Sequence, residues 1–174
     1  MKKLTIRQCL ILTMATMFFS SILWAQQASP PATATGKAGG ATITISYCSP
    51  GVKGRQIWGA LVPYDKVWRA GANAATIFET DKDITVEGKS LKAGKYSLYA
   101  IPGEKEWTII LNSQTGQWGI KMDGSTTEDP AKDVLRVTVK PQKPKTMQER
   151  LIYRVDKNGF ALVWENVEVP VMVK

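Results

Sequence analysis

The sequence predicts an all-β protein with one antiparallel β-sandwich or jelly-roll-like domain. Short segments alternate apolar and polar side chains, as half-buried strands do. Turn-forming residues separate these segments at the close spacing that is typical of sandwiches, and no window shows a sustained helical period. Eight or more short strands fit between residues 41 and 174, which favours antiparallel pairing over a parallel sheet.

Each expected strand is bounded by a recognisable turn. The strands are expected at residues 42–47, 75–80, 84–88, 95–102, 106–112, 134–141, 150–155, 160–166 and 167–173. Pro102-Gly103 predicts one hairpin, and Asn158-Gly159 predicts another because Asn-Gly readily adopts positive φ. Pro170 lacks a backbone N–H, so the last strand is expected at a sheet edge or a bulge. A single helical turn is expected near residues 130–134.

Residues 1–25 have the layout of a secretory signal peptide. They begin with basic residues, contain no acidic residue, carry an apolar run at positions 9–19 and end at Ala25. A membrane anchor is the alternative, but Thr and Ser interrupt a run already shorter than the roughly 20 residues that a spanning helix needs. We therefore expect cleavage after Ala25, export to the periplasm or beyond, and no remaining membrane span. Residues 26–40 are expected to be a flexible low-complexity leader before the domain at 41–174.

The composition excludes several kinds of chemistry. The chain contains no histidine, which excludes Ser-His and Cys-His catalysis and histidine-ligated metals. Cys9 would leave with the signal peptide, so Cys48 has no disulfide partner and is expected to pack as a small apolar residue. Removal of residues 1–25 lowers the net charge from +8 to +5, without any dense basic run. We expect no nucleic-acid partner, no cofactor and no metal site.

The segment from Lys53 to Asn73 is the strongest candidate for a site. Gly54, Gly59 and Gly71 interrupt it and Gly51 precedes it, so it is expected to be a loop folded across one sheet, and functional residues gather on such loops. Aromatic faces beside arginine and asparagine donors suit a sugar or an anionic group. The candidate ligand-binding residues are Lys53, Arg55, Trp58, Tyr64, Lys66, Trp68, Arg69 and Asn73, with Trp118 between two glycines as a further aromatic platform.

The same residues also have structural explanations. Arg69 could satisfy loop carbonyls, Trp68 could close the end of the sandwich, and Asn73 could cap a turn. Trp107 alternates with apolar neighbours and is expected in the core.

Several motifs together resemble a known bacterial family. They are VKGRQIWGALVPYDKVWRAGANAATIFET, LKAGKYSLYAIPGEKEWTIILN, QWG at 117–119 and DVLRVTVKP at 133–141. The chain resembles the family catalogued as domain of unknown function 2911 over nearly everything from Thr42 to Val173. The resemblance implies an exported protein of the Bacteroidetes type, and it implies no activity, cofactor or catalytic residue.

The acidic residues give a weaker signal. Asp123, Glu128, Asp129 and Asp133 cluster in one loop, where a solvated surface is favoured over a calcium site because EF-hand spacing is absent. Carboxylate pairs for glycoside hydrolysis could come from Glu79, Glu87, Glu106 or Glu165, but no spacing singles out a pair.

Three functions remain open at this point. The leading hypothesis is a non-enzymatic module that binds a glycan or another small polar or anionic ligand at the Lys53–Asn73 loop. A hydrolase or lyase is the second, with Tyr64 as base and Lys66 and Arg69 stabilising an anion. The third is a structural or interaction module whose Pro170 strand pairs with an envelope protein.

Overall fold

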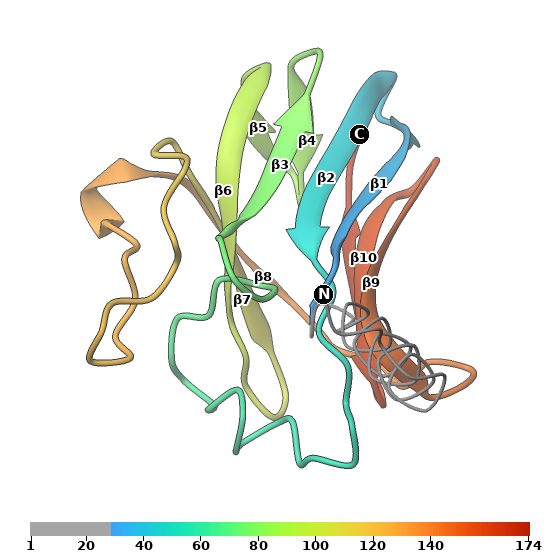
Figure 1. The fold of residues 1–174 in the computed structure, drawn as a ribbon. Helices are drawn as coiled ribbons and strands as arrows, with labels where there is room; N and C mark the ends of the chain where they lie inside the picture. Colours follow the sequence, from blue (N-terminus) through green and yellow to red (C-terminus); the bar gives the residue numbers. More distant parts are fainter. Residues whose placement is uncertain (1–28) are drawn as a thin grey trace, which may run out of the picture.

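The computed structural model describes residues 29–174, which form two antiparallel sheets and a short ribbon (Figure 1). This confirms the predicted all-β sandwich. The predicted signal peptide lies outside the described residues. The elements are β1 (Pro31–Ala38), β2 (Ala41–Cys48), β3 (Thr76–Thr80), β4 (Ile84–Val86), β5 (Lys89–Leu91), β6 (Gly94–Ile101), β7 (Trp107–Asn112), the 3₁₀ turn η1 (Pro130–Lys132), β8 (Asp133–Val139), β9 (Gln148–Asp156), β10 (Gly159–Glu165) and β11 (Val167–Met172).

The larger sheet has six strands in the order β1-β2-β3-β6-β7-β8, and the smaller has the order β11-β10-β9. The predicted hairpins β6–β7 and β9–β10 are both present. The ribbon β4–β5 extends the smaller sheet, because Val86 bridges to Val173 just beyond β11. β11 is an edge strand of its sheet, as Pro170 predicts, and Gln142 bridges to Glu168 along that edge.

The expectation of a flexible leader is wrong for residues 31–38. These residues form β1, which pairs along its whole length with β2, from Pro31 opposite Cys48 to Ala38 opposite Ala41. Small and hydroxyl side chains give no apolar run here, but alternate positions of β1 still pack against the core. The backbone of Gly36 lies so close to β9 that an added Cβ would be 2.6 Å from the carbonyl oxygen of Val155.

The turn between β9 and β10 differs in detail from the Asn-Gly prediction. Asp156 pairs with Gly159, so Lys157 and Asn158 are the central residues of the turn. Gly159 has φ +147°, and a Cβ there would lie 2.0 Å from the carbonyl oxygen of Val171 on β11. Glycine is therefore required for the close approach of two strands rather than for the centre of the turn.

The core lies between the two sheets. Phe78 of β3 meets Phe160 of β10 with ring centroids 5.4 Å apart, and Tyr47 of β2 meets Tyr153 of β9 at 4.9 Å. At one end of the sandwich lies the tryptophan tetrad of Trp58, Trp68, Trp107 and Trp164. Its two loop members, Trp58 and Trp68, pack against each other and against both of the others. Trp107 is buried, as the sequence predicts.

A second, smaller cluster covers the outer face of the larger sheet. Tyr99 of β6 and Ile110 of β7 are fully buried there with Ala75. The long connection of residues 113–132, which lies beside the larger sheet in Figure 1, provides part of the cover, since Thr127 contacts the Tyr99 hydroxyl at 3.5 Å. Its last turn is η1, close to the expected helical turn.

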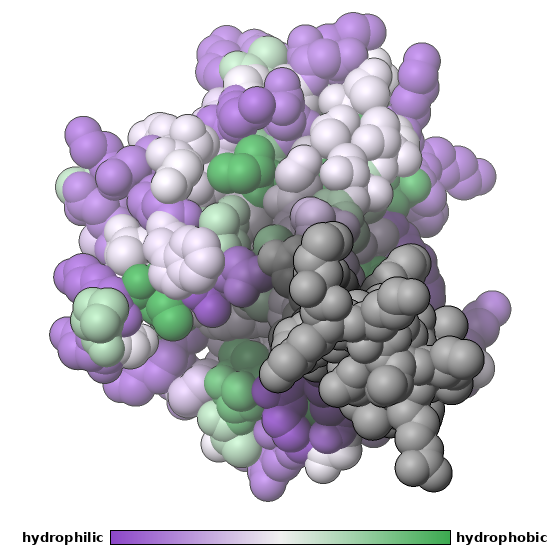
Figure 2. All heavy atoms as spheres, viewed as in Figure 1, coloured by the Kyte–Doolittle hydropathy of each residue, from purple (hydrophilic) through white to green (hydrophobic). Residues whose placement is uncertain are grey.

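The visible surface is mostly hydrophilic, with small separated hydrophobic patches (Figure 2). The large apolar side chains that are exposed are Leu61, Trp118, Met122, Val134, Met147 and Met172. Within residues 29–174, no helix has the length and apolarity needed to cross a membrane.

Gly36→Ala tests the packing of β1 against β9. We expect the new methyl group to collide with the Val155 backbone and to lower the free energy of unfolding by about 1–3 kcal/mol. Thr33→Ala, on the exposed side of the same strand, should change it by less than about 0.5 kcal/mol. Urea denaturation measures both. Equal stability of the two variants would contradict the packed strand and favour a leader.

Candidate ligand-binding site

The loop between β2 and β3, residues 49–75, closes one end of the sandwich (Figure 1). Trp58 from this loop packs edge-on against Trp107 of β7 at 4.9 Å and against Trp164 of β10 at 5.6 Å, so it joins both sheets. The backbone of Trp68 makes two hydrogen bonds with Ala100 of β6, of 2.7 and 2.8 Å. The structural role expected for Trp68 is therefore present, because the indole belongs to the tetrad.

The backbone after Arg69 is held in a strained conformation. Ala70 is fully buried and has φ +51°, a region that is costly for residues with a Cβ. Its carbonyl accepts hydrogen bonds from the Tyr153 hydroxyl at 2.8 Å and the Thr76 hydroxyl at 3.0 Å. Burial raises the pKa of Tyr153 well above its usual value, so the hydroxyl remains a donor. These contacts fix the direction in which Arg69 leaves the loop.

The connection of residues 113–132 lies directly on Arg69. A Cβ at Gly119 would be 2.6 Å from the Cβ of Arg69, so only glycine permits this approach. The Nη1 group of Arg69 donates to the carbonyl of Trp118 at 3.2 Å, and its guanidinium lies 5.9 Å from the centre of the Trp118 ring. Trp118 is 59% exposed.

An ion-pair network ties the same connection to the larger sheet. Arg136 of β8 contacts Glu128 and Asp133, each at 2.6 Å. The side chain of Glu128 is only 2% exposed, so the expectation of a solvated acidic loop is wrong for this residue. Burial raises the pKa of Glu128 and nearby Asp133 raises it further, whereas Arg136 lowers it. Asp129 caps η1 by accepting from the backbone N–H of Ala131.

The two loops enclose a cleft of about 1040 Å³. The loop of residues 49–75 contributes one side, and the connection of residues 113–132 contributes the other. Trp164 of the smaller sheet also lines the cleft. The remaining lining residues are Ser29, Pro50, Arg55, Leu61, Val62, Pro63, Asp65, Lys66, Val67, Trp68, Arg69, Gly71, Ala72, Asn73, Ile120, Asp123, Gly124, Ser125 and Thr126.

Five of the nine sequence-predicted site residues line this cleft: Arg55, Lys66, Trp68, Arg69 and Asn73. Asn73 has φ +57° and donates from Nδ2 to the carbonyl of Ser29 at 3.3 Å. Arg55 donates to the carbonyls of Gly51 and Val52, so it supports its own loop.

The other four predicted residues lie outside the lining of the cleft. Trp58 is buried beneath it in the tetrad, and Trp118 stands beside it on Arg69. Lys53 is exposed near Glu149, whose carboxylate accepts from its backbone N–H at 2.9 Å. Tyr64 lines a different pocket, so the arrangement does not bring it together with Lys66 and Arg69 in one site.

The charges in the cleft are mixed. Its cations are Arg55, Lys66 and Arg69, and its carboxylates are Asp65 and Asp123. Asp123 accepts from the hydroxyl and backbone N–H of Ser125, and these hydrogen bonds lower its pKa. None of the ion pairs among residues 29–174 involves Arg69. Partial burial lowers the pKa of Arg69 from its usual value.

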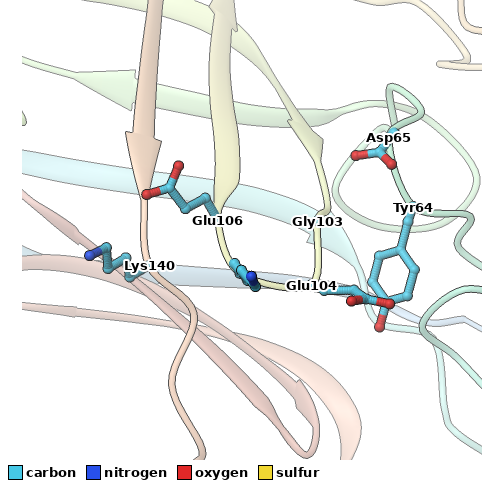
Figure 3. Close-up of a pocket in the computed structure, with 7 residues that line it drawn as sticks. Tyr64, Asp65, Gly103, Glu104, Glu106 and Lys140 are labelled. Atoms are coloured by element: carbon cyan, nitrogen blue, oxygen red, sulfur yellow. The ribbon is translucent and has the colours of Figure 1, made fainter.

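Figure 3 shows the second pocket, of about 780 Å³, near the β6–β7 turn. It is lined by Tyr64, Asp65, Gly103, Glu104, Lys105, Glu106 and Lys140. Asp65 comes from the 49–75 loop, whereas Glu104 and Glu106 come from the β6–β7 turn, and the three carboxylates do not converge on one position in this view. All three acidic residues are exposed. We therefore regard the cleft as the candidate site.

The other carboxylates considered for glycoside hydrolysis each have a different partner. Glu79 pairs with Lys95 at 3.2 Å, Glu87 accepts from the backbone of Met172, and Glu165 accepts from Asn166. No group of three or more potential metal ligands was found among residues 29–174. Cys48 is a free, partly buried thiol.

Some residues of the cleft carry no local sequence signal. Trp164 resembles any core residue of an alternating strand, and residues 123–126 resemble any polar turn. Only the packing of the two loops brings them to the Lys53–Asn73 segment. The QWG motif at 117–119 is the one signal that marks the second loop, because a tryptophan between two glycines is unusual for a plain surface turn.

The comparisons support the resemblance seen in the sequence. The model of the family described as "Protein of unknown function (DUF2911)" matches residues 29–173. No curated protein and no solved structure matches the chain.

Arg136→Leu tests the ion-pair network that anchors one side of the cleft. At pH 7 we expect the free energy of unfolding to fall by on the order of 3 kcal/mol, because Glu128 would be left charged and buried. A raised pKa means that the folded state holds this proton more tightly. The stability contribution of Glu128 is therefore full below the usual glutamate pKa and is lost as the pH rises through the raised value. The loss caused by Arg136→Leu should accordingly be smaller at pH 4.

Two further variants distinguish the effect of the buried ion-pair network from the effect of removing an exposed charge. Adding Glu128→Gln to Arg136→Leu should restore much of the stability at pH 7. Lys95→Leu, which removes the cation of the exposed pair with Glu79, should cost less than about 1 kcal/mol. Urea denaturation at both pH values measures all variants. A loss for Arg136→Leu that is the same at pH 4 and pH 7 would contradict the role of Glu128.

Proposed function

The chain belongs to the family of proteins of unknown function DUF2911, whose description names no activity, and we propose that it is a binding protein for a small polar ligand. The ligand binds in the cleft between the two loops. A carbohydrate is the ligand class that the lining suits best, because sugars present both an apolar ring face and many hydrogen-bonding groups.

The observation that carries this proposal is the composition of the cleft. Binding sites for small molecules are concave, mostly apolar and supplied with a few well-placed polar groups. Trp68 offers an aromatic surface beside the polar side chains of Lys66 and Asn73. The volume of about 1040 Å³ is large enough for a ligand of one to a few sugar rings.

The rigidity of the loop supports the same proposal. The backbone bridge from Trp68 to Ala100 and the two hydroxyls on the Ala70 carbonyl hold the binding side chains before any ligand arrives. Preorganisation of this kind lowers the entropy cost of binding. The segment at residues 1–25 further leads us to propose that binding takes place after export, in the periplasm or outside the cell.

A ligand screen read by melting temperature and by tryptophan fluorescence tests the proposal. A ligand that binds only the native state raises the melting temperature, and occupancy of the cleft should change the emission of Trp68 and Trp164. The panel is neutral sugars, sugar acids, phosphates and divalent metals. We expect a sugar or sugar acid to give both signals.

Two matched variants then locate the site. Trp68→Phe should weaken binding about tenfold, an effect of about 1.4 kcal/mol, because the indole lines the cleft. Trp107→Phe removes an indole of the same tetrad that does not line the cleft. It should lower the melting temperature while leaving the affinity unchanged. Equal loss of affinity in both variants, or a screen without any sugar ligand, would overturn the proposal.

A further inference from the structure

We propose that the ligand of the cleft is an acidic sugar, and that its carboxylate binds the guanidinium of Arg69. This inference rests on the proposed function and adds the chemical class of the ligand. It starts from a comparison of Arg69 with the other arginines that the structure describes.

The other arginines with hydrogen bonds in the structure have evident structural roles. Arg136 is neutralised by two carboxylates through Nε and Nη2. Arg55 uses Nε and Nη2 for two carbonyls of its own loop, and Arg150 donates to the carbonyl of Ser49. The first is an ion pair, and the other two brace a loop. Each role explains why an arginine is present.

Arg69 also braces a loop, through the carbonyl of Trp118, but this contact leaves most of its donors without a protein partner among the described residues. A guanidinium carries five N–H donors, and within residues 29–174 only one of them, on Nη1, meets a protein acceptor. The side chain is partly buried, burial lowers its pKa, and no carboxylate among residues 29–174 forms an ion pair with it. A partly desolvated cation that lacks a counterion is costly, and an oxyanion from a ligand would remove that cost.

The surroundings of Arg69 favour an anion from a ligand, rather than a carboxylate of the protein, as its partner. Lys66 adds a second positive charge to the same cleft. The Oδ1 atom of Asp123 on the opposite loop accepts from Ser125 at 2.6 and 2.9 Å, and no ion pair among residues 29–174 joins Asp123 to Arg69. Trp118 covers one side of the guanidinium, and its carbonyl takes one donor, so the group is held in place with donors left for a ligand.

The aromatic wall indicates which kind of anion fits. A free phosphate or acetate would leave Trp68 unused, whereas a ring that carries a carboxylate can pack on the indole and reach Arg69, since both residues line the cleft. Planar carboxylates match the guanidinium fork with two parallel hydrogen bonds. A uronic acid combines these two features.

The experiment compares sugars that differ only in the charged group. Dissociation constants are measured by calorimetry for galacturonate against galactose and for glucuronate against glucose, with the purified protein at low salt. We expect each acid to bind at least tenfold more tightly than its neutral partner. We also expect the difference to shrink as salt is raised, since a partly exposed ion pair is screened.

Two variants assign the effect to Arg69. Arg69→Gln should weaken the binding of each acid at least tenfold and should largely remove the preference for each acid over its neutral partner. Arg154→Gln removes the same charge from an exposed position on β9 and should change neither. If Arg69→Gln fails to fold, the comparison of acidic with neutral sugars on the wild-type protein still tests the inference.

The outcomes distinguish the inference from the function on which it rests. Neutral and acidic sugars that bind wild type equally would overturn the inference and leave a sugar-binding cleft. An acid preference that survives in Arg69→Gln would overturn the assignment to Arg69. Failure of every sugar to bind would overturn the proposed function itself. If acetate or phosphate binds as tightly as the sugar acids, the sugar ring adds no affinity. This result would overturn the sugar acid as the ligand class and favour a simple anion.

Discussion

The contact of four indoles at one end of the sandwich is the interaction on which the rest of the architecture depends. Trp58 and Trp68 come from the 49–75 loop, Trp107 from the larger sheet and Trp164 from the smaller one. Aromatic pairs at such distances contribute about 0.5–1.5 kcal/mol each beyond the area that they bury. Among residues 29–174 the N–H groups of Trp58 and Trp164 lack a hydrogen-bond partner, a cost that the packing must exceed.

Because Trp68 belongs both to the tetrad and to the lining of the cleft, the wall of the site is continuous with the core. The strained backbone at Ala70 follows directly. A left-handed alanine persists only where its surroundings determine it, and here two buried hydroxyls from β9 and β3 hold its carbonyl. Strained backbone conformations cluster at functional sites, where they set the direction of the neighbouring side chains. At this position the neighbour is Arg69.

Alternation of apolar residues, the Pro-Gly and Asn-Gly turn signals and the missing N–H of Pro170 together predicted the sandwich, its two hairpins and the edge position of the last strand. Alternation alone was not enough. It failed for β1, because Thr, Ala and Gly carry too little apolar surface to mark a strand that is stabilised by pairing with β2. It also failed for Glu128, whose burial depends on an arginine eight residues away on β8. Residue type identified Arg69 and Trp68 as candidates. Only tertiary packing could separate Tyr64 from them and add Trp164.

The cleft is bounded by two loops that are anchored by different forces. The 49–75 loop is held by apolar packing in the tetrad, which is insensitive to pH. The connection of residues 113–132 is held by the contact of Glu128 with Arg136, whose strength depends on pH because the pKa of Glu128 is shifted. Between the two loops, the side chain of Arg69 packs against the backbone of Gly119 and donates a hydrogen bond to the carbonyl of Trp118. A carboxylate bound to Arg69 would neutralise its charge, and Arg69 contacts both loops, so ligand affinity and loop anchoring are expected to be coupled through Arg69 rather than independent.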